Sequence, residues 1–217
     1  MKEKLVIWGA SSHALIVADI IRLQGDYEIV GFLDNVNKER AQSVFCGATI
    51  LGGAEQLDVL RQCGVNSMIC GIGNGLARLR LSAFARDKGY RLATAIHPRA
   101  TVAADVSVGA GTVIAAGAVI NSQVSLGENV LINTCASVDH ECTIEDAALI
   151  NAGAHLGGRI TIGRAASIEI GAIVAGRLRI GAGSVVGAGS VVLHDIPDDV
   201  LAYGAPARVI RELGTQD

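Results

Sequence analysis

The chain has 217 residues, of which 50% are hydrophobic but only 3% aromatic, and its formal net charge at pH 7 is −3. This length allows one large domain or two small ones. Because no basic block is present, neither nucleic acid nor an anionic membrane surface is an expected partner. The short apolar run near the N-terminus soon meets polar residues, so we predict neither a signal peptide nor a membrane-spanning segment.

Strands and helices alternate over residues 1–95. Strands are predicted at 4–8, 27–33 and 67–70, a short extended piece at 49–53, and helices at 14–23, 54–63 and 76–88. This alternation predicts a small Rossmann-like parallel α/β domain.

The turn Gly9–His13 follows the first predicted strand and opens the first helix. In a doubly wound sheet, phosphate meets free backbone N–H groups and the helix dipole at this place. The dinucleotide fingerprint GxGxxG is absent, because Ser11 and Ala14 occupy its second and third glycine positions, so NAD is not expected. Asp34 ends the second strand, where a carboxylate can accept from a ribose hydroxyl or a base N–H. A purely structural turn remains the alternative.

From residue 96 the pattern changes to a period of six. Every sixth residue is Ile, Leu or Val: Ile96, Val102, Val108, Ile114, Ile120, Leu126, Ile132, Val138, Ile144, Ile150, Leu156, Ile162, Ile168, Val174, Ile180, Val186 and Val192. This period fits neither a helix nor a simple strand, and it is the hexapeptide signature of a parallel β-helix. Three hexapeptides form one coil of 18 residues, and stacked coils bury a continuous aliphatic column.

The period fails at Leu193, so residues 193–217 are predicted to cap the solenoid, with a short helix at 207–213. A cap is needed because an open end exposes a sheet edge. The domains predicted are therefore 1–95, 96–192 and the cap at 193–217.

Five short motifs connect this chain with a known family. They are Gly9-Ala10-Ser11-Ser12-His13, Phe32-Leu33-Asp34-Asn35, Ile72-Gly73-Asn74…Arg78, Ile96-His97-Pro98, and Asn133 followed seven residues later by His140-Glu141-Cys142. The repeat resembles the left-handed β-helix acyltransferases, which use acetyl-CoA or another acyl-CoA and work as trimers. The whole chain is similar to bacterial sugar acyltransferases: N-acetyltransferases of nucleotide-linked 4-amino sugars and sialic acid O-acetyltransferases. The left hand of the β-helix is implied by this resemblance.

The resemblance implies a nucleotide-sugar site in the first domain. It would be lined by Ser11, Ser12, His13, Asp34, Asn35 and Gly73. The family has Gly where Ser12 stands, so this chain carries an additional side chain where the backbone approaches the ligand.

Asp139-His140-Glu141 is the candidate catalytic segment. It follows the inward-pointing Val138, where a corner of the solenoid is expected. An imidazole beside a carboxylate suits general-base chemistry, although a solvated corner triplet fits the spacing as well. By resemblance, His140 is the base, Glu141 is its partner and Asn133 helps to hold the substrate.

Acetyl-CoA contacts are implied at Leu149, Gly158, Ile170 and Ala188. Related N-acetyltransferases carry a second, CoA-contacting histidine nine residues after the base, and that position is Leu149 here. The contact at this point is therefore apolar or absent. His155 and His194 are interpreted as ordinary coil residues.

No metal site is predicted, because the nearest histidines, His140 and His155, are 15 residues apart and out of register in an 18-residue coil. Zinc requires nitrogens converging within about 2.1 Å.

The five cysteines contain no CxxC pair and are interpreted as reduced, mostly buried thiols of a cytoplasmic protein. They are Cys46, Cys63, Cys70, Cys135 and Cys142. Cys135 and Cys142 are read as packing residues, not nucleophiles.

The favoured function is acetyl transfer from acetyl-CoA to the amine of a nucleotide-linked amino sugar, for surface polysaccharide or glycan precursor synthesis, by a homotrimer. The alternative is O-acetylation of a sialic acid or a related sugar, and both reactions use one base. A non-catalytic sugar-nucleotide binder is a third interpretation. The sequence leaves the nucleotide and the sugar open.

Overall fold

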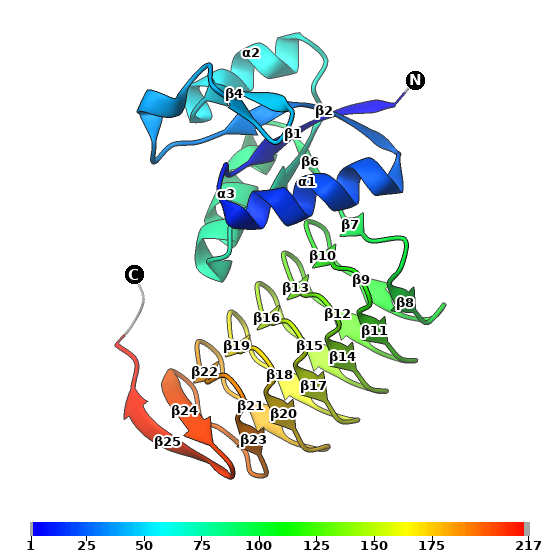
Figure 1. The fold of residues 1–217 in the computed structure, drawn as a ribbon, viewed down its shortest axis with the longest axis vertical. Coiled ribbons are helices and arrows are strands. Elements are labelled where there is room, and N and C mark those ends of the chain that lie inside the picture. The colour runs from blue at the N-terminus through cyan, green and yellow to red at the C-terminus, as the bar shows by residue number, and fades with distance from the viewer. Residues whose placement is uncertain (1, 215–217) are drawn as a thin grey trace. The chain divides into compact units, whose positions relative to one another are not determined.

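The computed structural model describes residues 2–214 (Figure 1). The chain divides into two compact units, with the boundary between Pro98 and Arg99. Residues 215–217, the last of the predicted cap, lie outside the described part of the chain.

The first unit is built around a parallel sheet. Its strands are β1 (Glu3–Trp8), β2 (Tyr27–Leu33), β3 (Val44–Phe45), β4 (Ala48–Gly52), β5 (Ser67–Cys70) and β6 (Arg91–Leu92), and β7 (Ala95–Ile96) follows. The helices are α1 (Ser12–Gln24), α2 (Leu57–Gln62) and α3 (Gly75–Asp87), with 3₁₀ turns at Lys38–Arg40 and Ala54–Gln56. The sheet order is β3-β4-β2-β1-β5-β6, and β3 alone runs antiparallel.

This order confirms the Rossmann-like prediction and defines the switch point of the sheet. The chain moves from β1 to β2 on one side and later to β5 on the other, so a switch point lies at the carboxyl end of β1. Ligands of doubly wound sheets bind at that point. The predicted helix at 54–63 starts as a 3₁₀ turn, and the short strands β3 and β6 were not predicted.

Gly9 allows the turn after β1 to pack closely against the loop after β5. Its φ is +125°, and a Cβ built there would lie 2.6 Å from the carbonyl oxygen of Gly71. Any other residue would be strained in the backbone and would push apart the loops after β1 and β5. The turn that was singled out in the sequence is therefore held against the loop that contains Gly73.

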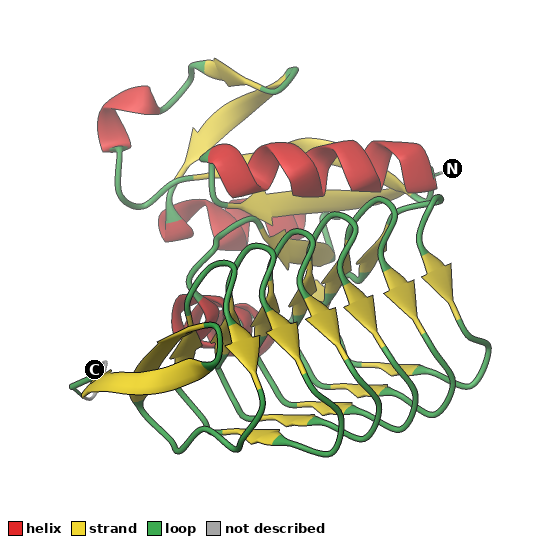
Figure 2. Cartoon of the chain, turned by 60° about the horizontal axis from the view of Figure 1, so that its bottom comes forward, coloured by secondary structure: helices red, strands yellow, loops and turns green. Residues whose placement is uncertain are grey.

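The second unit is a parallel β-helix with three sheets (Figures 1 and 2). The first solenoid sheet contains β10 (Val113–Ile114), β13 (Leu131–Ile132), β16 (Leu149–Ile150), β19 (Ser167–Ile168), β22 (Val185–Val186), β24 (Val200–Gly204) and β25 (Ala207–Glu212). The second contains β8 (Thr101–Val102), β11 (Val119–Ile120), β14 (Ser137–Val138), β17 (His155–Leu156), β20 (Ile173–Val174) and β23 (Val191–Val192). The third contains β9 (Ser107–Val108), β12 (Ser125–Leu126), β15 (Thr143–Ile144), β18 (Thr161–Ile162) and β21 (Arg179–Ile180).

From β8 to β20, each strand pairs with the strand 18 residues further along, as Ser137 with His155 and Val138 with Leu156. The six-residue period is confirmed as the source of the core, since its aliphatic residues are buried from Ile114 to Val192. The regular 18-residue register also places equivalent turn residues of successive coils directly above one another, so each corner forms a continuous edge (Figure 2).

The predicted helix at 207–213 is wrong: Ala207–Glu212 forms β25, antiparallel to β24. β24 pairs with β22 through one edge, and its other edge would expose unpaired backbone groups. A strand satisfies those groups, whereas a helix would leave them open. The cap therefore works by β-pairing.

Within residues 2–214, none of the helices has the length and apolar character that crossing a membrane requires.

Candidate active site

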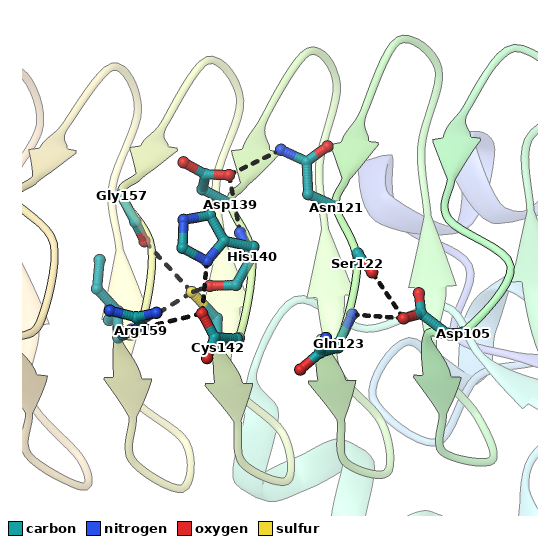
Figure 3. Close-up of polar contacts among 11 residues, drawn as sticks. Asp105, Asn121, Ser122, Gln123, Asp139, His140, Cys142, Gly157 and Arg159 are labelled. Carbon is teal, nitrogen blue, oxygen red and sulfur yellow. Dashed lines mark hydrogen bonds and ion pairs between the residues drawn. The ribbon is translucent and has the colours of Figure 1, made fainter.

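His140 lies in the turn between β14 and β15, at the corner that joins the second and third solenoid sheets (Figure 3). Glu141 follows with a left-handed φ of 58°, and this conformation turns the chain at the corner. Both side chains are partly exposed. The prediction of an outward corner after Val138 is confirmed.

One carboxylate oxygen organises the corner. Glu141 Oε2 lies 2.9 Å from His140 Nδ1 and 2.9 Å from Arg159 Nε, and Arg159 comes from the next coil (Figure 3). These hydrogen bonds, from Arg159 first and from His140 second, lower the pKa of Glu141, which is therefore ionised at neutral pH. An ionised carboxylate only accepts, so Nδ1 carries the shared hydrogen. In neutral His140 the basic nitrogen is then Nε2.

Asp139 supports the backbone of the same turn. Its Oδ1 accepts the His140 N–H at 2.8 Å and the Asn121 side-chain amide at 2.9 Å, the latter from the preceding coil. The Asn121 hydrogen bond is the main reason that the pKa of Asp139 lies below its usual value. The turn that contains His140 is therefore tied to the coils on both sides of it.

Gly158 provides the space that the imidazole occupies. A Cβ built on this residue would lie 2.7 Å from His140 Nε2. Gly157 is also without a side chain, and its carbonyl oxygen accepts from Cys142 Sγ at 3.3 Å. The surface beside Nε2 is consequently formed by backbone.

Cys142, which follows Glu141 in the chain, does not look like a nucleophile. Cys142 is buried, and burial raises the pKa of its thiol. Cys135 is exposed, as is Cys63, whereas Cys46 is half-buried, so the prediction of mostly buried thiols is wrong. Corner turns and helix ends hold the exposed ones, and the six-residue pattern carries no information about such positions. All five cysteines are free.

Asn133 lies at another corner, in the turn that joins the first and second solenoid sheets. Its side chain donates to Asn151 Oδ1 at 3.0 Å, and Asn151 donates to Glu169 at 3.0 Å. Ile170 and Ala188 occupy turns of this same edge, and Leu149 lies half-buried in the first solenoid sheet.

The structure thus sorts the predicted residues of the second unit into two groups. His140, Glu141 and Gly158 meet at one edge of the second solenoid sheet, whereas Asn133, Ile170 and Ala188 follow its other edge. Leu149 belongs to neither edge. The 18-residue register brings together residues that are one coil apart in sequence. Asn133 and His140 are only seven residues apart, and the register places them at different corners.

The predicted nucleotide-sugar residues all lie at the carboxyl edge of β2, β1 and β5, which are adjacent strands. Ser11 caps the start of α1 without a side-chain hydrogen bond, and the first turn of the helix contains no acidic residue. Such a helix start presents backbone N–H groups and a positive dipole end.

His13 lies in the first turn of α1, and its Nε2 is buried without a hydrogen-bond partner among the described residues. Burial, followed by the charge of Arg78, lowers the pKa of His13 to about 4. Its imidazole is therefore neutral at working pH and holds one unused polar atom.

This shift predicts a pH-dependent stability. In the unfolded chain, His13 becomes protonated below about pH 6.5. In the folded chain, it becomes protonated only below about pH 4, because its pKa is lowered. Folding stability is therefore lost as the pH falls through this window, by about 2 kcal/mol between pH 7.5 and pH 5. Urea denaturation at both pH values tests this. In His13→Gln the loss is expected to shrink by that amount, and an equal loss in both proteins would contradict it.

Asp34 and Asn35 are already engaged within the protein. Asp34 Oδ1 accepts from the backbone N–H groups of Val36 at 2.9 Å and Asn37 at 3.1 Å. Burial would raise the pKa of Asp34, but the hydrogen bonds from Asn37 and Val36 outweigh it and lower the pKa. Asn35 Oδ1 accepts from Trp8 Nε1 at 2.9 Å. Both residues shape the loop after β2.

Arg78 holds the loop after β5. Its fully buried guanidinium donates to the carbonyl oxygens of Ile72 at 3.1 Å and Gly73 at 2.6 Å. Burial lowers the pKa of Arg78 to about 10, so it is still charged at neutral pH. Gly73 therefore contributes a fixed backbone to this edge.

Arg40 is a residue of this edge that the sequence did not single out. Its Nη1 donates to Ala10 O at 2.7 Å and lies 3.7 Å from Asp34 Oδ2, and its guanidinium stacks 5.4 Å from the Phe45 ring centre. One cation thus joins the turn after β1 to the loop after β2. A single Arg in a polar loop gives no sequence signal for such a position.

For metals, residues 2–214 contain no group of three or more His, Cys, Asp and Glu side chains that could hold an ion.

Comparisons with known proteins agree with both units. The model of the PglD N-terminal domain matches residues 4–83. A mutant of perosamine N-acetyltransferase from Caulobacter crescentus, in complex with CoA and GDP-perosamine, is 35% identical, with a TM-score of 0.92 and coverage of 96% of this chain and 97% of that chain. The chain belongs to the hexapeptide-repeat sugar acyltransferases. Its solenoid is accordingly the left-handed β-helix that the resemblance implied.

Two further solved structures are similar over nearly the whole length of this acyltransferase. The acetyltransferase domain of PglB from Neisseria gonorrhoeae, in complex with acetyl coenzyme A, is 33% identical, with a TM-score of 0.90 and coverage of 97% of this chain and 100% of that chain. WeeI from Acinetobacter baumannii, at 24% identity, a TM-score of 0.86 and coverage of 96% and 100%, shares the fold. Among curated proteins, no match is found.

Proposed function

We propose that this acyltransferase transfers an acetyl group from acetyl-CoA to the amine of a nucleotide-linked amino sugar. The observation that carries the proposal is the His140–Glu141 pair, which leaves Nε2 basic beside the side-chain-free Gly157–Gly158 segment. Support comes from a relative whose structure holds CoA and GDP-perosamine, and from another that holds acetyl coenzyme A.

The residues present fit a direct transfer. Acetyl-CoA supplies a thioester whose carbonyl carbon accepts the amine. His140 Nε2 takes the proton that the amine loses as its nitrogen–carbon bond forms. As the carbon–sulfur bond breaks, His140 returns that proton to the departing sulfur. Glu141 stabilises the imidazolium that exists between these two steps.

In the first unit, we propose that the edge at β2, β1 and β5 binds the nucleotide half of the acceptor. The start of α1 offers N–H groups to phosphate, neutral His13 offers Nε2, and Arg40 offers a fixed positive charge. The absence of the glycine fingerprint still argues against NAD. Titrations with UDP, GDP, dTDP and NAD separate these ligands, and tight binding of NAD alone would overturn the proposal.

Arg40→Ala is expected to raise the KM for the nucleotide sugar by about tenfold or more, because hydrogen bonds to charged groups contribute about 1.5–3 kcal/mol. The KM for acetyl-CoA and the value of kcat are expected to stay within about twofold. Steady-state kinetics with both substrates varied provide the measurement. Lys38→Ala is the matched control, since this exposed cation belongs to the same 3₁₀ turn. An unchanged acceptor KM in Arg40→Ala would remove Arg40 from the site.

We also propose a homotrimer. The two groups of predicted residues border opposite edges of the second solenoid sheet, so one copy alone does not gather them at a single place. The outer surface of that sheet exposes Val119 and Ile173, and Ile170 is exposed beside it. A heterologous contact that closes after three copies would cover this surface. Light scattering is expected to give three times the 22.3 kDa mass of the chain, and a monomeric mass at micromolar concentration would exclude the trimer.

The proposed product is an N-acetylated sugar on a nucleotide, which is an activated donor for glycosyl transfer. We therefore assign the enzyme to surface polysaccharide or glycan precursor synthesis, and to the cytoplasm, where free thiols persist.

The deciding experiment follows thiol release from acetyl-CoA with UDP-, dTDP- and GDP-linked 4-amino sugars, and with sialic acid. Rapid release with one amino sugar, together with an amide product, is the expected result. Ester formation on sialic acid would establish the O-acetyltransferase alternative instead. Binding of sugar nucleotides without any thiol release would point to a non-catalytic binder.

A further inference from the structure

The corner that carries the candidate base contains a third participant, Arg159. It lies 18 residues after Glu141, in the equivalent turn of the next coil, with a similar left-handed φ of 63°. Its Nε donates to Glu141 Oε2, which is the same oxygen that His140 Nδ1 contacts (Figure 3). Its backbone N–H donates to His140 O at 2.9 Å.

We propose that Arg159 is a positioning residue for the base: it fixes Glu141 against the imidazole and offsets the charge of the carboxylate. This inference rests on the proposed function. A carboxylate alone would stabilise the imidazolium, and a base that is already protonated cannot accept the amine's proton. The guanidinium opposes this effect while it holds the carboxylate in place.

The other groups named around the imidazole carry no positive charge that could offset Glu141. On the same turn, Asp139 adds a second negative charge, and Cys142 is held neutral by the raised pKa of its thiol. The turn of the preceding coil presents the neutral residues Asn121, Ser122 and Gln123. In the next coil, the charged residue of the turn is Arg159.

Two hydrogen bonds together fix the orientation of the Glu141 carboxylate. Nε and Nδ1 approach one oxygen from two different coils, so Glu141 cannot rotate away from the ring without giving up both hydrogen bonds. In Arg159→Ala the backbone hydrogen bond to His140 O stays available, and only the side-chain effect is removed. The substitution therefore tests the charge without dismantling the turn.

The test compares Arg159→Ala, Arg159→Lys and Arg177→Ala in the full-length protein. Arg177 is the matched control, because it is exposed, has a φ of 67° and occupies the equivalent turn one coil further on. For Arg159→Ala, the midpoint of the acid limb of the kcat–pH profile is expected to move up by about 0.5–1 pH unit. At pH 6.5, kcat is expected to fall by about three- to tenfold, and at pH 9 by less.

Arg159→Lys is expected to recover at least half of the shift, and Arg177→Ala to leave the midpoint within about 0.2 unit of wild type. NMR titration of the His140 imidazole provides a second measurement that requires no substrate. It therefore tests the effect of Arg159 even if the proposed reaction is not the one catalysed. A titration midpoint that stays unchanged in Arg159→Ala would overturn the proposal. An equal shift in Arg177→Ala would also overturn it, since it would show a general effect of surface charge.

Discussion

His140→Ala is expected to reduce kcat by about 10² to 10⁴-fold, the usual contribution of a general base. The acceptor amine must lose a proton as it attacks, and His140 Nε2 is the basic nitrogen that the Glu141 hydrogen bond leaves available. The side chain is partly exposed at a corner and fills no core position, so the fold and acetyl-CoA binding are expected to persist. Steady-state kinetics and calorimetric titration of acetyl-CoA measure these quantities.

Two companion variants sharpen this result. Glu141→Ala is expected to cost less than His140→Ala, because Glu141 supports the base without taking the proton itself. His155→Ala is the matched control: His155 is exposed in β17, with Ser137 Oγ 2.8 Å from its Nδ1, and is expected to retain nearly full activity. If His140→Ala kept more than about a third of the wild-type kcat, the proton would leave by another route.

Gly158→Ala is expected to lower kcat by about 10²-fold, although it adds only a methyl group. That methyl group would lie 2.7 Å from His140 Nε2 and 2.8 Å from its Cε1. The backbone of Gly158 is not in the left-handed region, and the imidazole is a movable side chain, so the ring shifts while the coil is retained. A displacement of about 1 Å at a catalytic group can cost this much in rate.

The double variant His140→Ala/Gly158→Ala separates displacement of the base from damage to the coil. If the methyl group acts only through the ring, the double variant is expected to be no slower than His140→Ala. Thermal melting is expected to show intact coils in both proteins. A double variant that is a further tenfold slower would mean that Gly158 acts on the substrate or on the fold instead.

The sequence by itself determined the two-unit plan and the position of His140 and Glu141 at a corner of the solenoid. A six-residue aliphatic period indicates a β-helix, because in this fold each inward side chain lies beside the equivalent side chain one coil away. The alternation of strands and helices in residues 1–95 determined the parallel sheet, and the inward position of Val138 in the six-residue period marked the corner at Asp139–Glu141. These features are local or strictly periodic, so they can be read along a single chain.

The tertiary structure decided the features that depend on neighbours distant in sequence. Arg159 meets Glu141 only because 18-residue coils stack in register, and Arg40 meets Ala10 only because β1 and β2 are adjacent. The same register places Asn133 at a different edge from His140, and the unpaired edge of β24 turns the predicted terminal helix into a strand. The reason is physical: hydrogen bonds and charges act over a few ångströms in space, whatever the separation along the chain.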